Sequence, residues 1–185
     1  MPVVQACLCL FLLSACSGNN SGLPAVGVDG GPQDRSRSSL PFWLPDDGEV
    51  QTGGYVELMA WLLAGNYRDW ESESEVRPST QGPKGVRIFL NSSLAGSLFD
   101  AEEEHPVGST AVRELYEEDL ETLSGFALAI KTGNGSRDRA GNWFWFETFG
   151  LQEDMEPIIV GHAAPGCMPC HSQGVDFIRS FYPLR

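Results

Sequence analysis

Basic side chains are scarce in this sequence. Its 185 residues include 12 lysines and arginines against 25 aspartates and glutamates, a formal net charge of −13 at pH 7. Such a surface is repelled by nucleic-acid phosphates and by anionic membrane surfaces, so the composition argues against nucleic acid as a partner. A basic protein that docks by charge complementarity fits better, although a high charge also serves solubility alone.

The N-terminal apolar run is too short to span a bilayer as a permanent helix. It reads MPVVQACLCLFLLSAC, fewer than the roughly 20 residues that a membrane helix needs. Its length and small final residues are typical of a secretory signal, although no basic residue precedes it. Its last four residues, LSAC, resemble the bacterial lipobox. We therefore expect residues 1–16 to be a lipoprotein signal ending at lipidated Cys16, and 17–40, rich in Gly and Ser, to be a flexible tether.

Residues 41–185 then form one folded domain, exported and lipid-anchored to a bacterial membrane, in the periplasm or at the cell surface. Cysteine is scarce in this domain. Cys7 and Cys9 leave with the signal and Cys16 takes the lipid, so Cys167 and Cys170 are the thiols that remain.

Aromatic and β-branched residues are plentiful, and their spacing sets the fold class. Short segments of this kind, bounded by turn residues, predict strands at 86–91, 110–116, 126–132 and 143–148. Helix-forming segments are predicted at 55–64, 67–75 and 93–99. The polar loop 133–142 predicts that the last two strands are antiparallel neighbours. The sequence thus predicts an α+β domain, with an antiparallel sheet of about four to five strands and flanking helices.

The strand WFWFE carries aromatic residues on both faces. Trp143 and Trp145 alternate with Phe144 and Phe146, so neither face can be fully wet. A helix is expected to cover one face, and a large flat apolar cofactor could cover part of the other.

The C-terminal segment Gly166 to His171, GCMPCH, carries the chemistry. Two thiols separated by two residues, with an imidazole directly after the second, are typical of covalent attachment of haem c. One turn of chain brings both sulfurs to the vinyl groups on one porphyrin edge, and the next residue turns its imidazole toward the iron. The motif predicts one haem, bound by Cys167 and Cys170, with His171 as the iron ligand.

Three alternatives use the same residues. A structural zinc site needs four ligands, which His162 and His105 could complete. A thioredoxin-like pair normally follows a strand at the start of an α/β unit, and a disulfide needs only an oxidising compartment. Neither the pair nor the disulfide explains the adjacent histidine, and export is the condition under which bacteria attach haem c. A zinc-binding or disulfide-stapled surface lipoprotein remains an alternative.

The sixth iron position decides between electron transfer and binding of a small ligand. Its candidate ligands are Met59, Met155, Met168, His105 and His162. Met168 lies inside the attachment loop and cannot reach across the ring, and none of the others stands out. We expect an open or water-occupied distal site.

The position of the motif, at the end of a β-rich domain, differs from that of helical cytochromes c. The chain resembles the cytochrome P-460 and cytochrome c′-β family, over residues 67 to 185. The segments that carry the resemblance are NYRDWESESEV, GPKGVRIFLNSSLAGSL, HPVGSTAVRELY, NWFWFE and GCMPCH. The resemblance implies a haem packed against an antiparallel sheet, a five-coordinate iron and a distal pocket facing strand side chains. Members commonly form dimers, so a homodimer is compatible with it.

Members of this family oxidise hydroxylamine or bind nitric oxide, and the enzymes link a lysine to the haem edge. Arg113 stands where many similar sequences have that lysine, and a guanidinium is a poor nucleophile. Lys84 and Lys131 are the only lysines. Lys131 is the better candidate for a link, although a solvated charge at a strand end explains it more simply.

The remaining candidate site residues lie in the predicted strands. Glu114 and Glu147 could shuttle protons in an oxidation, or face solvent. An apolar distal pocket for a neutral diatomic could be lined by Phe89, Phe126, Phe144 and Phe146. The preferred hypothesis is a mono-haem cytochrome for electron transfer or nitric oxide binding, with a redox partner protein. The alternative is a hydroxylamine-oxidising enzyme.

Overall fold

The computed structural model describes residues 54–80, 82–134 and 139–185. The predicted signal, the tether and Cys16 lie outside the described residues. Residues 135–138 of the predicted hairpin loop 133–142 also lie outside the described residues.

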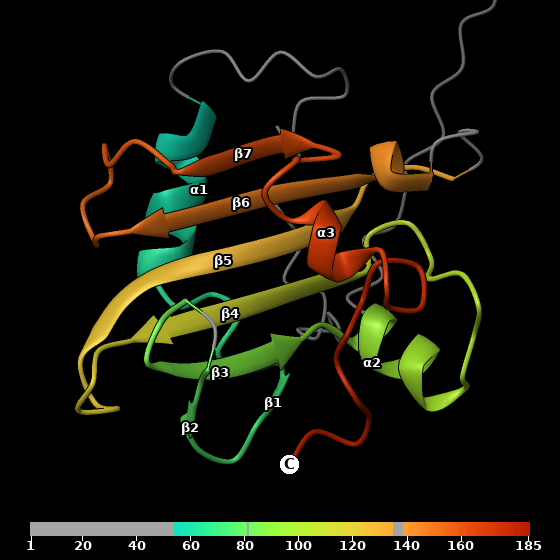
Figure 1. Ribbon diagram of the computed structural model, residues 1–185, viewed down its shortest axis with the longest axis horizontal. Helices are drawn as coiled ribbons and strands as arrows, with labels where there is room; N and C mark the ends of the chain where they lie inside the picture. The colour runs from blue at the N-terminus through green and yellow to red at the C-terminus, as the bar shows by residue number, and fades with distance from the viewer. Residues whose placement is uncertain (1–53, 81, 135–138) are drawn as a thin grey trace, which may run out of the picture. The chain divides into compact units, whose positions relative to one another are not determined.

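An antiparallel sheet forms the centre of the described domain (Figure 1). Its strands are β1 Glu71–Ser72, β2 Arg77–Pro78, β3 Gly85–Leu90, β4 Thr110–Tyr116, β5 Leu123–Lys131, β6 Trp143–Phe149 and β7 Ile159–His162. Their order is β1-β3-β4-β5-β6-β7, and β2 also pairs with β3. The predicted α+β class is confirmed. The sheet has seven strands rather than four to five, because β1, β2 and β7 are too short to show a pattern in the sequence.

The helices are α1 Gly54–Leu63, α2 Ser92–Phe99 and α3 Met168–His171, with a 3-10 turn η1 at Arg139–Asn142. The four predicted strands and the first and third predicted helices match β3 to β6, α1 and α2 to within three residues at each end. Strands β5 and β6 are antiparallel neighbours, as predicted, with Lys131 opposite Trp143.

The predicted helix at residues 67–75 is wrong. Gly65 ends α1 with φ of +70°, and the chain then turns through Arg68 and Trp70, whose amides donate to the carbonyls of Gly65 and Tyr67. The following residues join the sheet edge as β1, where the Glu73 amide donates to the carbonyl of Ile88. Pairing with β3 satisfies the backbone groups that a helix would otherwise have satisfied.

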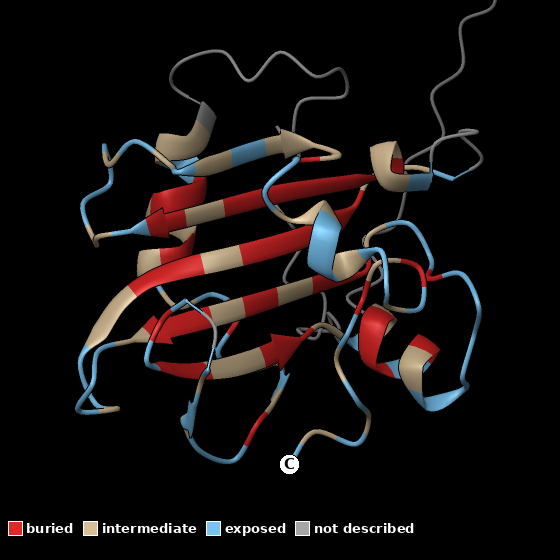
Figure 2. Ribbon diagram, viewed as in Figure 1, coloured by how far each residue is buried: buried red, intermediate tan, exposed pale blue. Residues whose placement is uncertain are grey.

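The two faces of the sheet are covered differently (Figures 1 and 2). Helix α1 lies behind the sheet in Figure 1, where Leu58 and Leu62 join a buried cluster with Phe144 and Phe146. Helix α3 lies in front of it, and α2 and the C-terminal segment pack on the same side. We call these the phenylalanine face and the tryptophan face, since Trp143 and Trp145 are buried on the second. The predicted alternation along β6, with a helix on one side, is therefore confirmed.

Candidate functional site

The Cys-x-x-Cys-His segment forms the short helix α3 on the tryptophan face. The amides of Cys167 and Met168 donate to the carbonyl of Ala164, and that of His171 donates to Cys167. Proline at position 169 is tolerated because the first turn of a helix needs no donor there. Residues three apart on a helix share one side, so the turn presents both thiols in the same direction, with Cys167 half-buried and Cys170 exposed.

The imidazole of His171 is held in one orientation. Its Nδ1 lies 2.8 Å from the carbonyl oxygen of Phe177, and since a carbonyl only accepts, Nδ1 is the protonated nitrogen. The lone pair is then on Nε2. The ring also packs against Trp145, with 4.4 Å between ring centroids. Burial lowers the pKa of His171, which keeps the imidazole in the neutral form that a metal ligand requires.

The two thiols differ from those of a redox-active pair. Burial, reinforced by Glu147 and Cys170, raises the pKa of the Cys167 thiol to about 11. Thioredoxin-like chemistry needs a thiol whose pKa is lowered instead. Zinc has no better support, since within the described residues no group of three His, Cys, Asp or Glu side chains is arranged to hold a metal ion. A haem iron differs, because it needs only one or two protein ligands.

The sheet beside α3 is lined by small side chains. On the tryptophan face, Ala129 of β5 and Gly161 of β7 lie directly opposite Trp145. Ala127 is the cross-strand partner of both Arg113 and Glu147. A side-chain carbon built at Gly161 would meet nothing within 4 Å. Alternation places all of these side chains on one face, where Ala129 and Trp145 are buried in the cluster that Cys167 and Met168 pack against.

Polar groups lie on this same surface without partners. Within the described part of the chain, the Nε1 atom of Trp145 and the Nε atom of Arg113 are buried and make no hydrogen bond. Burial raises the pKa of Glu147, and the Arg113 guanidinium opposes that rise. The tryptophan face thus carries small apolar side chains together with a cation, an acid and an oriented imidazole, a set of groups compatible with an apolar cofactor that has charged substituents, as haem has.

The four phenylalanines predicted to line a distal pocket lie elsewhere. Phe89, Phe126, Phe144 and Phe146 are all buried in the cluster beneath α1 on the phenylalanine face. Two of the candidate sixth ligands are there as well: Met59 is fully buried in that cluster, and His162 packs against Phe144. Because strand side chains alternate, the structure does not bring these residues together with the motif.

The two candidate acids, Glu114 and Glu147, lie on opposite faces of the sheet. Glu114 is 2% exposed and accepts hydrogen bonds from the hydroxyls of Tyr67 at 2.6 Å and Tyr116 at 2.5 Å. Burial, followed by the bond to Glu114, raises the pKa of Tyr116 to about 12, so the phenol remains the donor. Arg68 completes the group from 3.3 Å. Glu114 is therefore a fully bonded carboxylate, whereas Glu147 lies on the tryptophan face with the motif.

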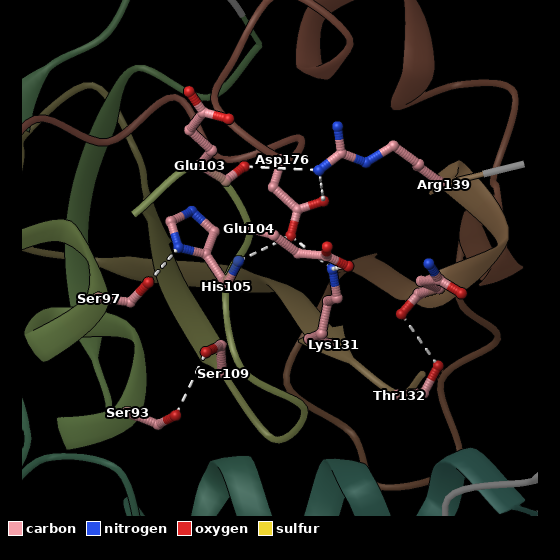
Figure 3. Close-up of polar contacts among 11 residues, drawn as sticks. Ser93, Ser97, Glu103, Glu104, His105, Ser109, Lys131, Thr132, Arg139 and Asp176 are labelled. Carbon is pink, nitrogen blue, oxygen red and sulfur yellow. Dashed lines mark hydrogen bonds and ion pairs between the residues drawn. The ribbon is translucent and has the colours of Figure 1, made fainter. Parts of the chain in front are cut away.

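Lys131 is not a solvated strand-end charge, which corrects the simpler expectation. Its side chain is fully buried, with Nζ 2.5 Å from Asp176 Oδ2 and 3.4 Å from Glu104 Oε1 (Figure 3). Asp176, the partner that makes this burial tolerable, is 45 residues further along the chain, so the pair cannot be inferred from sequence. Its position five residues after the motif was the only available signal.

Beside this ion pair lies His105, which is 1% exposed and has Nδ1 2.8 Å from Ser97 Oγ (Figure 3). Burial lowers the pKa of His105, whereas in the unfolded chain its imidazole takes up a proton near pH 6.5. Below that pH the unfolded state binds more protons, so the free energy of unfolding falls as the pH falls.

We accordingly expect thermal unfolding to occur at a lower temperature at about pH 5.5 than at about pH 7.5. His105→Gln should reduce this difference without abolishing it, because burial lowers the pKa of His171 as well. The measurement is the unfolding midpoint of both proteins at both pH values. An equal drop in the two proteins would show that His105 does not contribute.

The fold and the site together define an antiparallel α+β domain that carries a Cys-x-x-Cys-His helix on the tryptophan face of its sheet. No protein-family model matches the chain, and no curated protein matches it. Among the described residues, no helix is long and apolar enough to cross a membrane.

Proposed function

We propose that this protein is an exported mono-haem c-type cytochrome, of the cytochrome P-460 and c′-β type, that transfers electrons or binds nitric oxide. The observation that carries the proposal is the hydrogen bond from His171 Nδ1 to the Phe177 carbonyl. It leaves Nε2 for a metal, directly after two free thiols one helical turn apart. Cys167 and Cys170 would hold the haem by thioether bonds, and His171 would ligate its iron.

Cys167, Cys170 and His171 would hold the haem on the tryptophan face, where α3 lies. When bound, it supplies a one-electron iron couple and a coordination position for a small ligand. Trp145 holds the plane of the His171 ring by packing against it at 4.4 Å. The half-buried Arg113 guanidinium, whose Nη2 donates to Ser79 Oγ at 3.4 Å and whose Nε makes no hydrogen bond, would neutralise negative charge brought into this face.

An open distal site is supported by where the candidate sixth ligands lie. Met59 and His162 are on the opposite face of the sheet, and His105 has its Nδ1 2.8 Å from Ser97 Oγ. Met155 lies against Gly150, directly after β6. An iron with a free position binds a neutral diatomic such as nitric oxide, whereas a six-coordinate iron serves electron transfer alone.

Hydroxylamine oxidation at a lysine-linked haem is supported less well. The Lys131 side chain is fully buried, and its Nζ is engaged in ion pairs with Asp176 at 2.5 Å and Glu104 at 3.4 Å, so it is not free to reach a haem edge. Lys84 is exposed in the turn that precedes β3. The third candidate position carries Arg113, whose guanidinium stays protonated.

Lipidation at Cys16 and export are part of the same proposal, since they supply the compartment in which haem c is attached. The tether would let the domain reach a redox partner from a membrane anchor. Because the domain is acidic, a partner with a basic docking surface is favoured.

The experiment uses protein expressed with a haem-attachment system. Its absorption spectrum is recorded for the oxidised protein, for the dithionite-reduced protein, and for the reduced protein after addition of nitric oxide. We expect a high-spin reduced spectrum that nitric oxide shifts. A sharp low-spin reduced spectrum that is indifferent to nitric oxide would contradict the open site and leave an electron carrier. A strongly red-shifted reduced Soret band would instead favour the lysine-linked enzyme.

A further inference from the structure

The segment after α3 contains a turn in an unfavourable conformation. Residues 175 to 178 form a tight turn, in which the Ile178 amide donates to the Val175 carbonyl over 2.9 Å. Both central residues have positive φ, +42° at Asp176 and +67° at Phe177. Glycine, asparagine and aspartate favour such positions, so Asp176 suits its place, whereas a bulky residue such as Phe177 rarely adopts one. Strain of this kind persists only where surrounding contacts hold it.

The carboxylate of Asp176 supplies those contacts (Figure 3). Its Oδ2 accepts from Lys131 Nζ at 2.5 Å and from the backbone amide of His105 at 3.0 Å. The side chains of Asp176 and Lys131 are both fully buried, and Arg139 approaches Oδ1 from 4.0 Å. Strand β5 and the loop before β4 thus hold the turn from outside.

This turn also fixes the imidazole of His171. Phe177, the strained residue of the turn, provides the carbonyl that accepts from His171 Nδ1. Gly174 lets the chain enter the turn, since a side-chain carbon there would lie 2.2 Å from the Ile178 oxygen. Ile178 anchors the other end, 5% exposed in the tryptophan-face cluster. A continuous set of contacts therefore runs from Lys131 through Asp176 and Phe177 to the imidazole.

We propose that Asp176 is a positioning residue for the haem's proximal histidine, and that Lys131 is its buried counter-ion rather than a haem cross-link. This inference rests on the proposed function. By holding the Phe177 carbonyl on Nδ1, Asp176 fixes the ring orientation and increases the electron donation of Nε2 to the iron. Stronger donation stabilises the oxidised iron, so the anchor keeps the reduction potential low.

Asp176→Gly tests this directly, because glycine adopts positive φ without strain while the anchoring carboxylate is removed. In haem-loaded protein we expect a higher reduction potential and a lower iron–histidine stretching frequency in the resonance Raman spectrum of the reduced state. An effect on the order of tenfold in the ratio of oxidised to reduced haem at a fixed potential corresponds to about 59 mV. Asp176→Asn, which still accepts from the His105 amide, should restore part of both values.

Glu104→Gln is the matched control. Glu104 also pairs with Lys131, but it is 47% exposed and is not part of the turn. The reduction potential of the haem in Glu104→Gln should therefore equal that of wild type. If Asp176→Gly does not fold, Lys131→Met/Asp176→Asn removes both buried charges together and should shift both values in the same direction.

The outcomes separate the two proposals. If the wild-type protein carries no covalent haem, the proposed function and this inference both fail. If all variants carry haem and the Asp176 variants lose stability with the potential and the stretching frequency unchanged, the inference alone fails, and Asp176 is purely structural.

Discussion

Replacing both Cys167 and Cys170 by alanine is expected to abolish covalent haem attachment completely. The two residues are the free thiols of the described domain, and they lie one helical turn apart beside His171. Thioether bonds survive denaturation, whereas a haem held by His171 alone dissociates when the chain unfolds. Haem staining after denaturing electrophoresis should therefore be strong for wild type and absent for Cys167→Ala/Cys170→Ala.

Ser172→Ala provides the control for this prediction, since Ser172 is exposed and directly follows the motif. It should stain as strongly as wild type. Each single cysteine variant should keep one thioether and give weaker staining, because the remaining thiol can still react. Full covalent haem in the double variant would show that the attachment site lies elsewhere in the chain.

The second large effect is expected on stability. Lys131→Met leaves the buried carboxylate of Asp176 without its closest cation, since Arg139 is 4.0 Å away and more than half exposed. Removing one partner of a buried ion pair typically costs about 3–5 kcal/mol, because the other charge remains desolvated and unpaired. We expect a loss of that size in the free energy of unfolding, measured by urea denaturation.

Two further proteins test the cause of that loss. Lys131→Met/Asp176→Asn should recover much of it, because no buried charge is then left alone. Lys84→Met, which replaces the exposed lysine, should change the free energy of unfolding by less than about 0.5 kcal/mol. A small effect of Lys131→Met, equal to that of Lys84→Met, would show that the ion pair does not stabilise the fold.

The central strands could be predicted from sequence because their patterns are physically explicit. Strand β4 matches its predicted bounds at Thr110–Tyr116, and the aromatic alternation of β6 predicted two dry faces, one beneath a helix. Short edge strands such as β7 could not be found, since four residues with an exposed valine have no readable period. The helix predicted at residues 67–75 is wrong for a related reason, because pairing with β3 outweighed the local helix propensity.

The candidate site shows the same division. The spacing of Cys167, Cys170 and His171 is local, so sequence was sufficient to single them out. Which sheet face the motif would occupy depends on the path of the whole chain, and this is why the predicted phenylalanines lie on the opposite face. The pairing of Lys131 with Asp176 joins two distant segments, and neither residue predicts the other.

The intact mass of the purified wild-type protein, expressed with a haem-attachment system and measured under denaturing conditions, tests the central claim most directly. We predict the mass of the processed polypeptide with its lipid on Cys16, plus one haem. A mass equal to that of the polypeptide alone, under conditions in which a known cytochrome c is fully loaded, would contradict it.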